Sequence, residues 1–179
     1  MKKIIITLLT MVGICSIANA QDKENKALAE PLPHKVENLE LIDLSNNLTK
    51  LPMWGEKHLL IFYVDPDRYN QNNAFTVEIE ENRAASSDKI YGFGILNLKD
   101  TWLPNNVIRT IARKRTEKNH ATIISDVDRT VATKWKLGDC NNQFIIMFVT
   151  KDGELVFCKK GAFTEADKAE FYEMIKKYS

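Results

Sequence analysis

Three runs of almost uninterrupted apolar residues constrain the fold of this chain more than any other feature. They span His58–Val64, Lys89–Leu96 and Phe144–Val149. A strand with one face in water alternates polar and apolar residues, whereas a strand that is buried on both faces does not. The three runs therefore predict the centre of a sheet that helices cover on both sides.

Helical patterns fall between these strands. Phe75 and Ile79 stand four residues apart and predict a helix over residues 70–83. Pro104 suits the first turn of a second helix, and residues 129–137 predict a short third one. The second helix is expected to turn one apolar stripe toward the sheet, formed by Val107, Ile108, Ile111 and Ala112.

Two hairpins and a closing helix complete the pattern. The first hairpin is expected within residues 36–53, and the second joins Phe144–Val149 to residues 154–158. Thr164 suits the N-cap of the last helix, with Asp167 three residues on, which is a variant of the capping box. This order of elements indicates an α/β fold with a mixed central sheet and helices on both faces.

The first twenty residues have the pattern of a secretory signal peptide. Two lysines precede an apolar run over residues 4–17, and a small-x-small triplet ends at Ala20. The run is shorter than the roughly 20 apolar residues that a membrane span needs. A lipid anchor at Cys15 is the alternative, but Ile14 stands where a small residue is expected. The pattern predicts cleavage after Ala20 and a periplasmic or secreted protein.

Removing these twenty of 179 residues leaves 159, with 23 basic and 24 acidic side chains. Such a balance gives no support to a protein that holds nucleic acid by bulk positive charge. No later segment is apolar enough to span a bilayer. Residues 21–35 are polar, contain two prolines and are expected to be flexible, so the folded domain is predicted to cover residues 36–179.

Several segments along this domain resemble the thioredoxin-like superfamily in its longer, peroxiredoxin-type form. They include the helix after Asp100, the pair Ser125-Asp126, the end of a short helix at residues 135–138 and the hairpin at residues 148–154. The resemblance implies a three-layer α/β/α sandwich with a central mixed sheet and an N-terminal β-hairpin extension.

The last fifty residues are more specifically similar to the YtfJ family of exported thioredoxin-like proteins. Residues 132–137 (ATKWKL), 150–156 (TKDGELV) and 160–164 (KGAFT) carry this likeness, together with the closing helix. The family has no well-defined biochemical activity, so the likeness implies a fold and an exported protein rather than a reaction.

The chain departs from the superfamily where thiol chemistry takes place. A thiol-disulfide oxidoreductase of this fold has Cys-x-x-Cys after the first core strand, at a helix N-terminus that lowers the thiol pKa. Here that place reads Asp65-Pro66-Asp67-Arg68-Tyr69-Asn70, with Asp67 and Asn70 near the two cysteine places. The usual proline before the third long strand is also absent, because no proline follows Pro104. We therefore expect a non-redox protein that acts as a binding or interaction module.

Cys140 and Cys158 form the alternative site. Cys140 precedes the third long strand and Cys158 ends its hairpin partner, where it is expected opposite about residue 145. The two cysteines could be unpaired, could form a structural disulfide or could act as an atypical thiol-disulfide oxidoreductase pair.

The candidate binding residues lie in the loops after the first two core strands and in the segment before the third. They are Asp67, Asn70, Trp102, Asp139 and Asn141, and an envelope protein is the expected partner. We expect a monomer with no cofactor. We also expect no metal, because no two histidines or cysteines have metal-ligand spacing.

Two further patterns have ordinary explanations. Residues 126–130 imitate the D-x-D-x-T loop of haloacid-dehalogenase phosphatases, and Gly138-Asp139 imitates part of their later acidic motif. Only twelve residues separate Asp126 from Gly138, whereas that family needs most of a domain between the two motifs. Asp128 is instead expected to cap the following helix. The basic residues Arg109, Arg113, Lys114, Arg115 and Lys118 fit a solvated helix face, with an anionic partner as the alternative.

Overall fold

The computed structural model describes residues 29–83, 87–119 and 121–179. Within this part of the chain, the strands form one eight-stranded sheet in the order β1-β8-β7-β4-β5-β6-β2-β3. The strands are β1 His34–Lys35, β2 Glu40–Asp43, β3 Leu48–Lys50, β4 His58–Val64, β5 Ile90–Asn97, β6 Ile123–Asp126, β7 Phe144–Val149 and β8 Glu154–Lys160. The helices are the 3₁₀ turn η1 Pro66–Arg68, α2 Asn73–Glu81, α3 Asn105–Asn119, α4 Thr130–Lys134 and α5 Glu165–Tyr178.

The three apolar runs form the middle of this sheet, as the sequence predicts. β4 lies between β5, to which it is parallel, and β7, to which it is antiparallel. All six residues of β7 are buried, because the strand has neighbours on both edges and side chains packed on both faces. The central sheet is therefore mixed.

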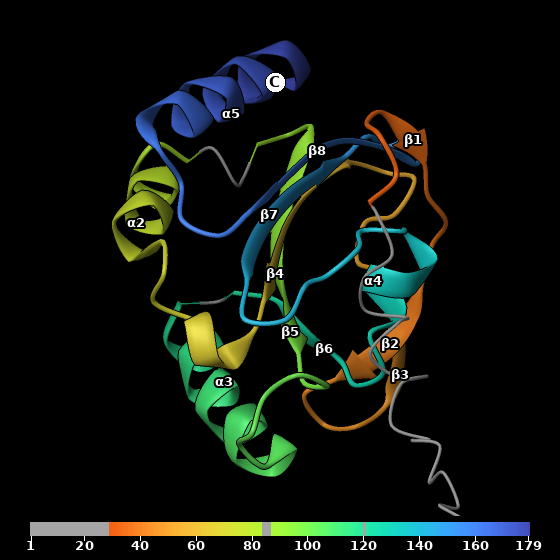
Figure 1. Ribbon diagram of the computed structural model, residues 1–179, viewed down its shortest axis with the longest axis vertical. Helices are drawn as coiled ribbons and strands as arrows, with labels where there is room; N and C mark the ends of the chain where they lie inside the picture. The colour runs from red at the N-terminus through yellow and green to blue at the C-terminus, as the bar shows by residue number, and fades with distance from the viewer. Residues whose placement is uncertain (1–28, 84–86, 120) are drawn as a thin grey trace, which may run out of the picture.

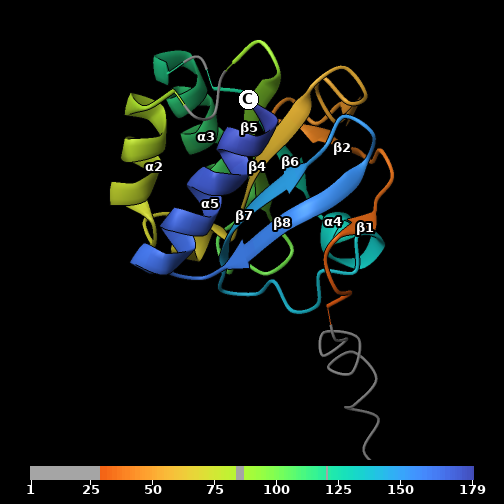
Figure 2. The ribbon, with the colours of Figure 1, turned by 90° about the horizontal axis from the view of Figure 1, so that it is seen from above.

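Helices cover both faces of the sheet, so the predicted three-layer α/β/α architecture is confirmed (Figure 1). On one side lie α2, α3 and α5, and on the other lies α4 (Figure 2). Phe75 of α2 and Phe171 of α5 pack with β7 on the first side. Trp135, which follows α4, is fully buried on the second side. No helix in the described residues is both long and apolar enough to cross a bilayer.

The predicted N-terminal hairpin is formed by β2 and β3, and β2 joins the sheet by antiparallel pairing with β6. The predicted signal peptide and residues 21–28 of the expected flexible segment lie outside the described residues. Residues 34 and 35 of that segment form β1, which pairs with β8. The sheet thus begins two residues before the predicted boundary at residue 36.

The predicted apolar stripe of α3 is only half correct. Ile108 and Ala112 are buried, but Val107 is 43% exposed and Ile111 is 60% exposed. The helix contacts the rest of the fold along a narrow strip, and its basic flank is tied to the first hairpin. Arg109 donates to the Asn46 side chain (3.0 Å), and Arg113 donates to the carbonyl of Leu44. These two arginines therefore do not form a purely solvated face.

A buried carboxylate, and not the expected Asp128, fixes the start of α4. Asp126, at the end of β6, accepts hydrogen bonds from the backbone N–H groups of Thr130 and Val131 (both 2.8 Å). It also accepts one from the hydroxyl of Tyr63 on β4 (3.2 Å). Asp128 is exposed. The backbone at Arg129 is left-handed (φ 59°), and the N–H groups at the start of α4 therefore point to Asp126. One side chain thus joins β4, β6 and α4.

The capping box that the sequence predicts for α5 is present. The backbone N–H of Asp167 donates to the Thr164 hydroxyl (3.2 Å), and the backbone N–H of Thr164 donates to the Asp167 carboxylate (2.8 Å). The same carboxylate forms an ion pair with Lys159 on β8. The pair and the cap together lower the pKa of Asp167 to about 2.

Replacing Asp126 with alanine is expected to lower the free energy of unfolding by about 2–4 kcal/mol, because it leaves buried donors without an acceptor. Tyr63→Phe removes one of these hydrogen bonds and should cost about 1 kcal/mol. Urea unfolding followed by tryptophan fluorescence measures both values. Asp128→Ala is the matched control and should leave stability within about 0.5 kcal/mol of wild type. Equal losses from the two alanine variants would contradict the capping role of Asp126.

Asp167→Asn is expected to reduce the sensitivity of the fold to acid. The folded-state pKa of Asp167 lies below its ordinary value of 3.8, so the ionised carboxylate stabilises the fold above about pH 4. That contribution is lost as the pH falls from about 4 to about 2. Stability measured against pH should therefore fall less steeply in this window for Asp167→Asn. Glu173→Gln, an exposed change on the same helix, should keep the wild-type slope.

Candidate functional site

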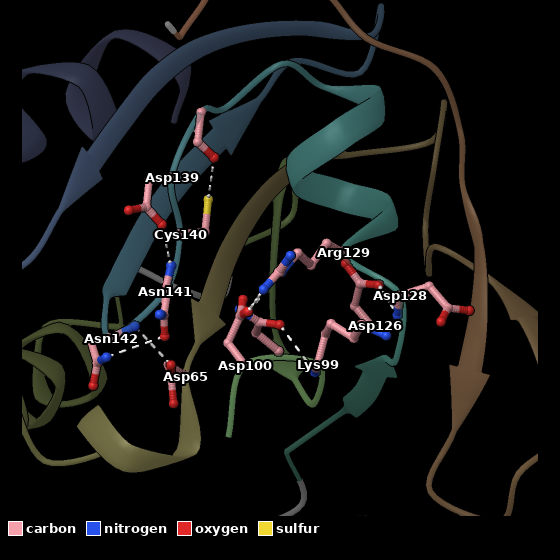
Figure 3. Close-up of polar contacts among 12 residues, drawn as sticks. Asp65, Lys99, Asp100, Asp126, Asp128, Arg129, Asp139, Cys140, Asn141 and Asn142 are labelled. Carbon is pink, nitrogen blue, oxygen red and sulfur yellow. Dashed lines mark hydrogen bonds and ion pairs between the residues drawn. The ribbon is translucent and has the colours of Figure 1, made fainter. Parts of the chain in front are cut away.

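The carboxyl ends of β4, β5 and β6 meet the loop before β7 at one edge of the sheet. Figure 3 shows the side chains that gather there, from Asp65, Asp100, Asp126 and residues 139–142. Parallel strands place their carboxyl ends on the same edge, which is where open α/β sheets bind ligands. Relatives with the Cys-x-x-Cys motif would carry their thiols directly after β4.

At that place this chain has a 3₁₀ turn held by a buried aspartate. Asp65 is the N-cap of η1 and accepts a hydrogen bond from the backbone N–H of Asp67 (2.9 Å). Its other oxygen accepts from the backbone N–H of Asn142 (2.8 Å), so the loops after β4 and before β7 are joined. Burial raises the pKa of Asp65, and the two backbone donors oppose that rise. The turn is a structural tie with no group that can exchange a disulfide.

A second tie joins the loop after β5 to the start of α4. Arg129 forms an ion pair with Asp100, whose side chain is only 2% exposed, and its Nε lies 2.6 Å from the carboxylate. Asn97 donates to the other Asp100 oxygen (2.6 Å). The bonded carboxylate raises the pKa of Arg129. The positive charge of Arg129 is therefore neutralised by the protein itself.

The buried carboxylates of the edge are already bound by protein donors. Asp65 and Asp126 hold backbone N–H groups, and Asp100 holds Arg129. Burial raises the pKa of Asp126, and the backbone N–H groups that it accepts oppose the rise. Among the described residues, no three His, Cys, Asp or Glu side chains are arranged to hold a metal ion. The buried carboxylates at this end of the strands thus have a structural role.

The structure connects the loops that carry the predicted binding residues. The Thr101 hydroxyl donates to the Asp67 carboxylate (3.2 Å), so the loop after β5 is fixed to the loop after β4. Trp102, the next residue, is 80% exposed. Asn70 is also exposed, and its neighbour Tyr69 is 59% exposed. Tyr69 belongs to the loop of residues 65–70, which the sequence predicts as a binding surface, but it is not among the predicted site residues. Its sequence position alone does not distinguish a surface aromatic residue from a core one.

The two remaining predicted residues lie in the loop before β7. Asp139 and Asn141 are both exposed, and Asp139 accepts a hydrogen bond from the Asn141 backbone N–H (2.9 Å). The bond from Asn142 to Asp65 places this loop beside η1. The predicted residues therefore lie on three connected loops, although no direct contact joins Asp139 or Asn141 to Trp102 among the contacts of the described residues.

Both cysteines of the described residues, Cys140 and Cys158, are free thiols that pack in the same core cluster, on the α4 side of the sheet. Cys140 is 4% exposed, and its thiol donates to the Gly138 carbonyl (3.5 Å). Burial raises the pKa of Cys140 to about 12 and that of Cys158 to about 11. Thiols with such values are overwhelmingly protonated at neutral pH and are weak nucleophiles.

The expected position of Cys158 in the hairpin is wrong. Cys158 lies opposite Met147 and not opposite residue 145. The turn pairs Thr150 with Glu154 (2.8 Å), and a bulge near Phe148 inserts an extra residue into β8. Because a bulge shifts every later pair, counting back from the turn gives the wrong partner.

Comparison with known proteins rests on structure alone. No family model matches the chain, and a search of curated proteins finds no match. The pneumococcal exposed lipoprotein thioredoxin Etrx1 from Streptococcus pneumoniae is similar, with a TM-score of 0.55 and 11% identity, over 79% of this chain and 99% of that one.

Two further structures give the same result. One is the C-terminal domain of a protein described as a thiol-disulfide oxidoreductase from Bacteroides thetaiotaomicron, with a TM-score of 0.56 and 16% identity over 85% of this chain and 99% of that one. The other is a peroxiredoxin-like protein from Aquifex aeolicus, with a TM-score of 0.56 and 8% identity over 86% of this chain and 91% of that one. Identities this low show the fold alone. The chain has the thioredoxin-like fold that the sequence predicts, in a version without thiols after β4.

Proposed function

We propose that this protein is a non-redox, exported member of the thioredoxin-like superfamily, of the YtfJ type, that binds a protein partner in the cell envelope. Its binding surface would be the edge surface, which we define as Asp67, Tyr69, Asn70, Trp102, Asp139 and Asn141. The N-terminal pattern of residues 1–20 supports export, and the segments similar to the YtfJ family support the family.

The observation that carries the proposal is the exposure of Trp102 on a fixed loop. A tryptophan side chain that is 80% exposed leaves a large apolar surface in water. Thr101 is held by Asp67, so the loop that carries this side chain is attached to η1. Tryptophan and tyrosine are the residue types that contribute most to protein interfaces. Two exposed aromatic residues on two connected loops therefore favour a partner-binding surface.

The burial of both thiols in the described part of the chain supports a non-redox role. The place after β4 holds Asp65 and Asp67, and both of their carboxylates are engaged in structural hydrogen bonds. The alternative function is a thiol-disulfide oxidoreductase that uses Cys140 and Cys158. It would need at least one accessible thiol with a lowered pKa, whereas burial raises both pKa values here.

Alkylation of the native protein tests the thiol alternative. At pH 8 we expect both cysteines to react with iodoacetamide at least about a hundredfold more slowly than in urea, because few thiolates form at this pH. The rate should rise with pH between 8 and 10, since both raised pKa values lie above this range. Mass spectrometry of timed samples gives the rate at each site. Rapid labelling of either cysteine at pH 7 would favour the oxidoreductase alternative.

Site-specific crosslinking tests the edge surface. A benzoylphenylalanine placed at Trp102 should crosslink a reproducible envelope protein when cells are irradiated. The matched control places the same group at Leu48, which is 70% exposed on β3. Trp102→Ala should abolish crosslinking from a benzoylphenylalanine at Tyr69 while leaving the urea midpoint unchanged, because Trp102 is not part of the core. Equal products from positions 102 and 48, or none from either, would contradict the proposed surface.

A further inference from the structure

The outer edge of β8 is covered over only part of its length. β8 spans Glu154–Lys160, but β1 pairs only with Glu154 and Leu155. Figure 2 shows β8 along the rim of the sheet, with β1 beside its first part. The second half of the strand ends near the loop of residues 137–139, whose carbonyls accept hydrogen bonds from the Lys160 side chain.

The backbone groups that this edge presents follow from the pairing with β7. Gly161 donates its N–H to the Phe144 carbonyl (2.9 Å), and Cα pairs continue along the two strands through Cys158 and Met147. Groups on an antiparallel strand alternate between its two neighbours. The N–H and C=O groups of Cys158 and Lys160 therefore point away from β7. Within the described part of the chain, no hydrogen bond engages these four groups.

The chain before β1 does not continue along β8, because α4 holds it elsewhere. The backbone N–H of Glu30 donates to the Lys136 carbonyl (3.0 Å), and the His34 ring lies in hydrogen-bond contact with the Trp135 carbonyl (3.0 Å). Lys136 also forms an ion pair with Glu30 (2.9 Å). These contacts turn residues 29–33 toward α4 and leave the second half of β8 without a neighbouring strand.

We propose that this open edge of β8 binds an extended, acidic segment of another polypeptide by β-strand addition. Unpaired donors and acceptors on a sheet edge form a template for an extended chain. This inference does not rest on the proposed function, because it is argued from the backbone groups of β8 and uses no side chain of the edge surface. The two sites meet at Asp139, whose carbonyl accepts a hydrogen bond from Lys160.

The charge at the edge selects an acidic segment. The Lys160 ammonium group binds the carbonyls of Leu137 and Asp139 (2.7 Å to Asp139), and no carboxylate of the described residues lies within ion-pair distance of it. An added strand with carboxylates would supply the missing counter-charge. Lys159 is already paired with Asp167. A second copy of this chain is disfavoured, because its β8 would bring a second Lys160 to the same edge, and like charges across neighbouring strands destabilise pairing.

Amide hydrogen exchange of the full protein tests whether the edge is open. The amides of Cys158 and Lys160 should exchange about a hundredfold faster than those of Phe157 and Lys159, which bond to β7. Equal protection of all four amides would show that the edge is covered and would overturn the proposal. Protection that grows with protein concentration would assign the edge to a second copy and would overturn it as well.

A titration with an acetylated and amidated (Glu-Val)₃ peptide tests the strand addition itself. We expect NMR shifts to centre on Val156, Cys158 and Lys160, and exchange of the Cys158 and Lys160 amides to slow by about tenfold or more at saturation. The matched controls are the same peptide with every amide nitrogen methylated and a (Lys-Val)₃ peptide, and neither should bind. Equal binding of the methylated peptide would mean attraction by charge alone, and shifts confined to Tyr69 and Trp102 would place binding at the edge surface; either result would overturn the proposal.

Discussion

The arrangement of this molecule depends on the buried carboxylate of Asp126. Taking a carboxylate out of water is costly, and the raised pKa of Asp126 reflects that cost. The cost is offset by the backbone N–H groups of α4 and the hydroxyl of Tyr63, which all donate to it. The position of α4 in turn sets that of Trp135, which is fully buried and donates its indole N–H to the Glu37 carbonyl (3.0 Å). A single side chain thus connects the central strands to the N-terminal segment.

The candidate site also depends on buried carboxylates that are bound by groups of the protein. Asp65 and Asp100 are buried near the place of the missing thiols, and each is bound by groups of the protein. Those ties fix the loops after β4 and β5, and neither the Asp65 nor the Asp100 carboxylate is left free for chemistry. A fixed frame lowers the entropic cost of presenting an exposed side chain to a partner. The exposed Trp102 on this frame fits the partner-binding surface that we propose.

Local and long-range features differ in how well the sequence predicts them. β7 is predicted to the residue, because burial on both faces leaves an uninterrupted apolar run, and the Thr164 cap is predicted because its partners lie three residues apart. Helical spacing also predicts an apolar stripe on α3, but the sequence cannot show that only Ile108 and Ala112 of this stripe are buried and that Ile111 stays exposed. The cap of α4 depends on the left-handed backbone at Arg129, and the register of Cys158 depends on a β-bulge. No local sequence pattern predicts either feature.

The open edge of β8 is a consequence of how α4 is fixed. Because Asp126 holds the start of α4, the carbonyls of Trp135 and Lys136 that follow this helix are in place to bind His34 and Glu30. The chain before β1 therefore runs toward α4, and only two residues remain to pair with β8. Sheet edges are usually blocked by charge, by proline or by a covering segment. Here, among the described residues, neither a proline nor a neighbouring strand lies beside Cys158 and Lys160 on β8. The same contacts that order the N-terminal segment thus leave an edge that a second polypeptide can complete.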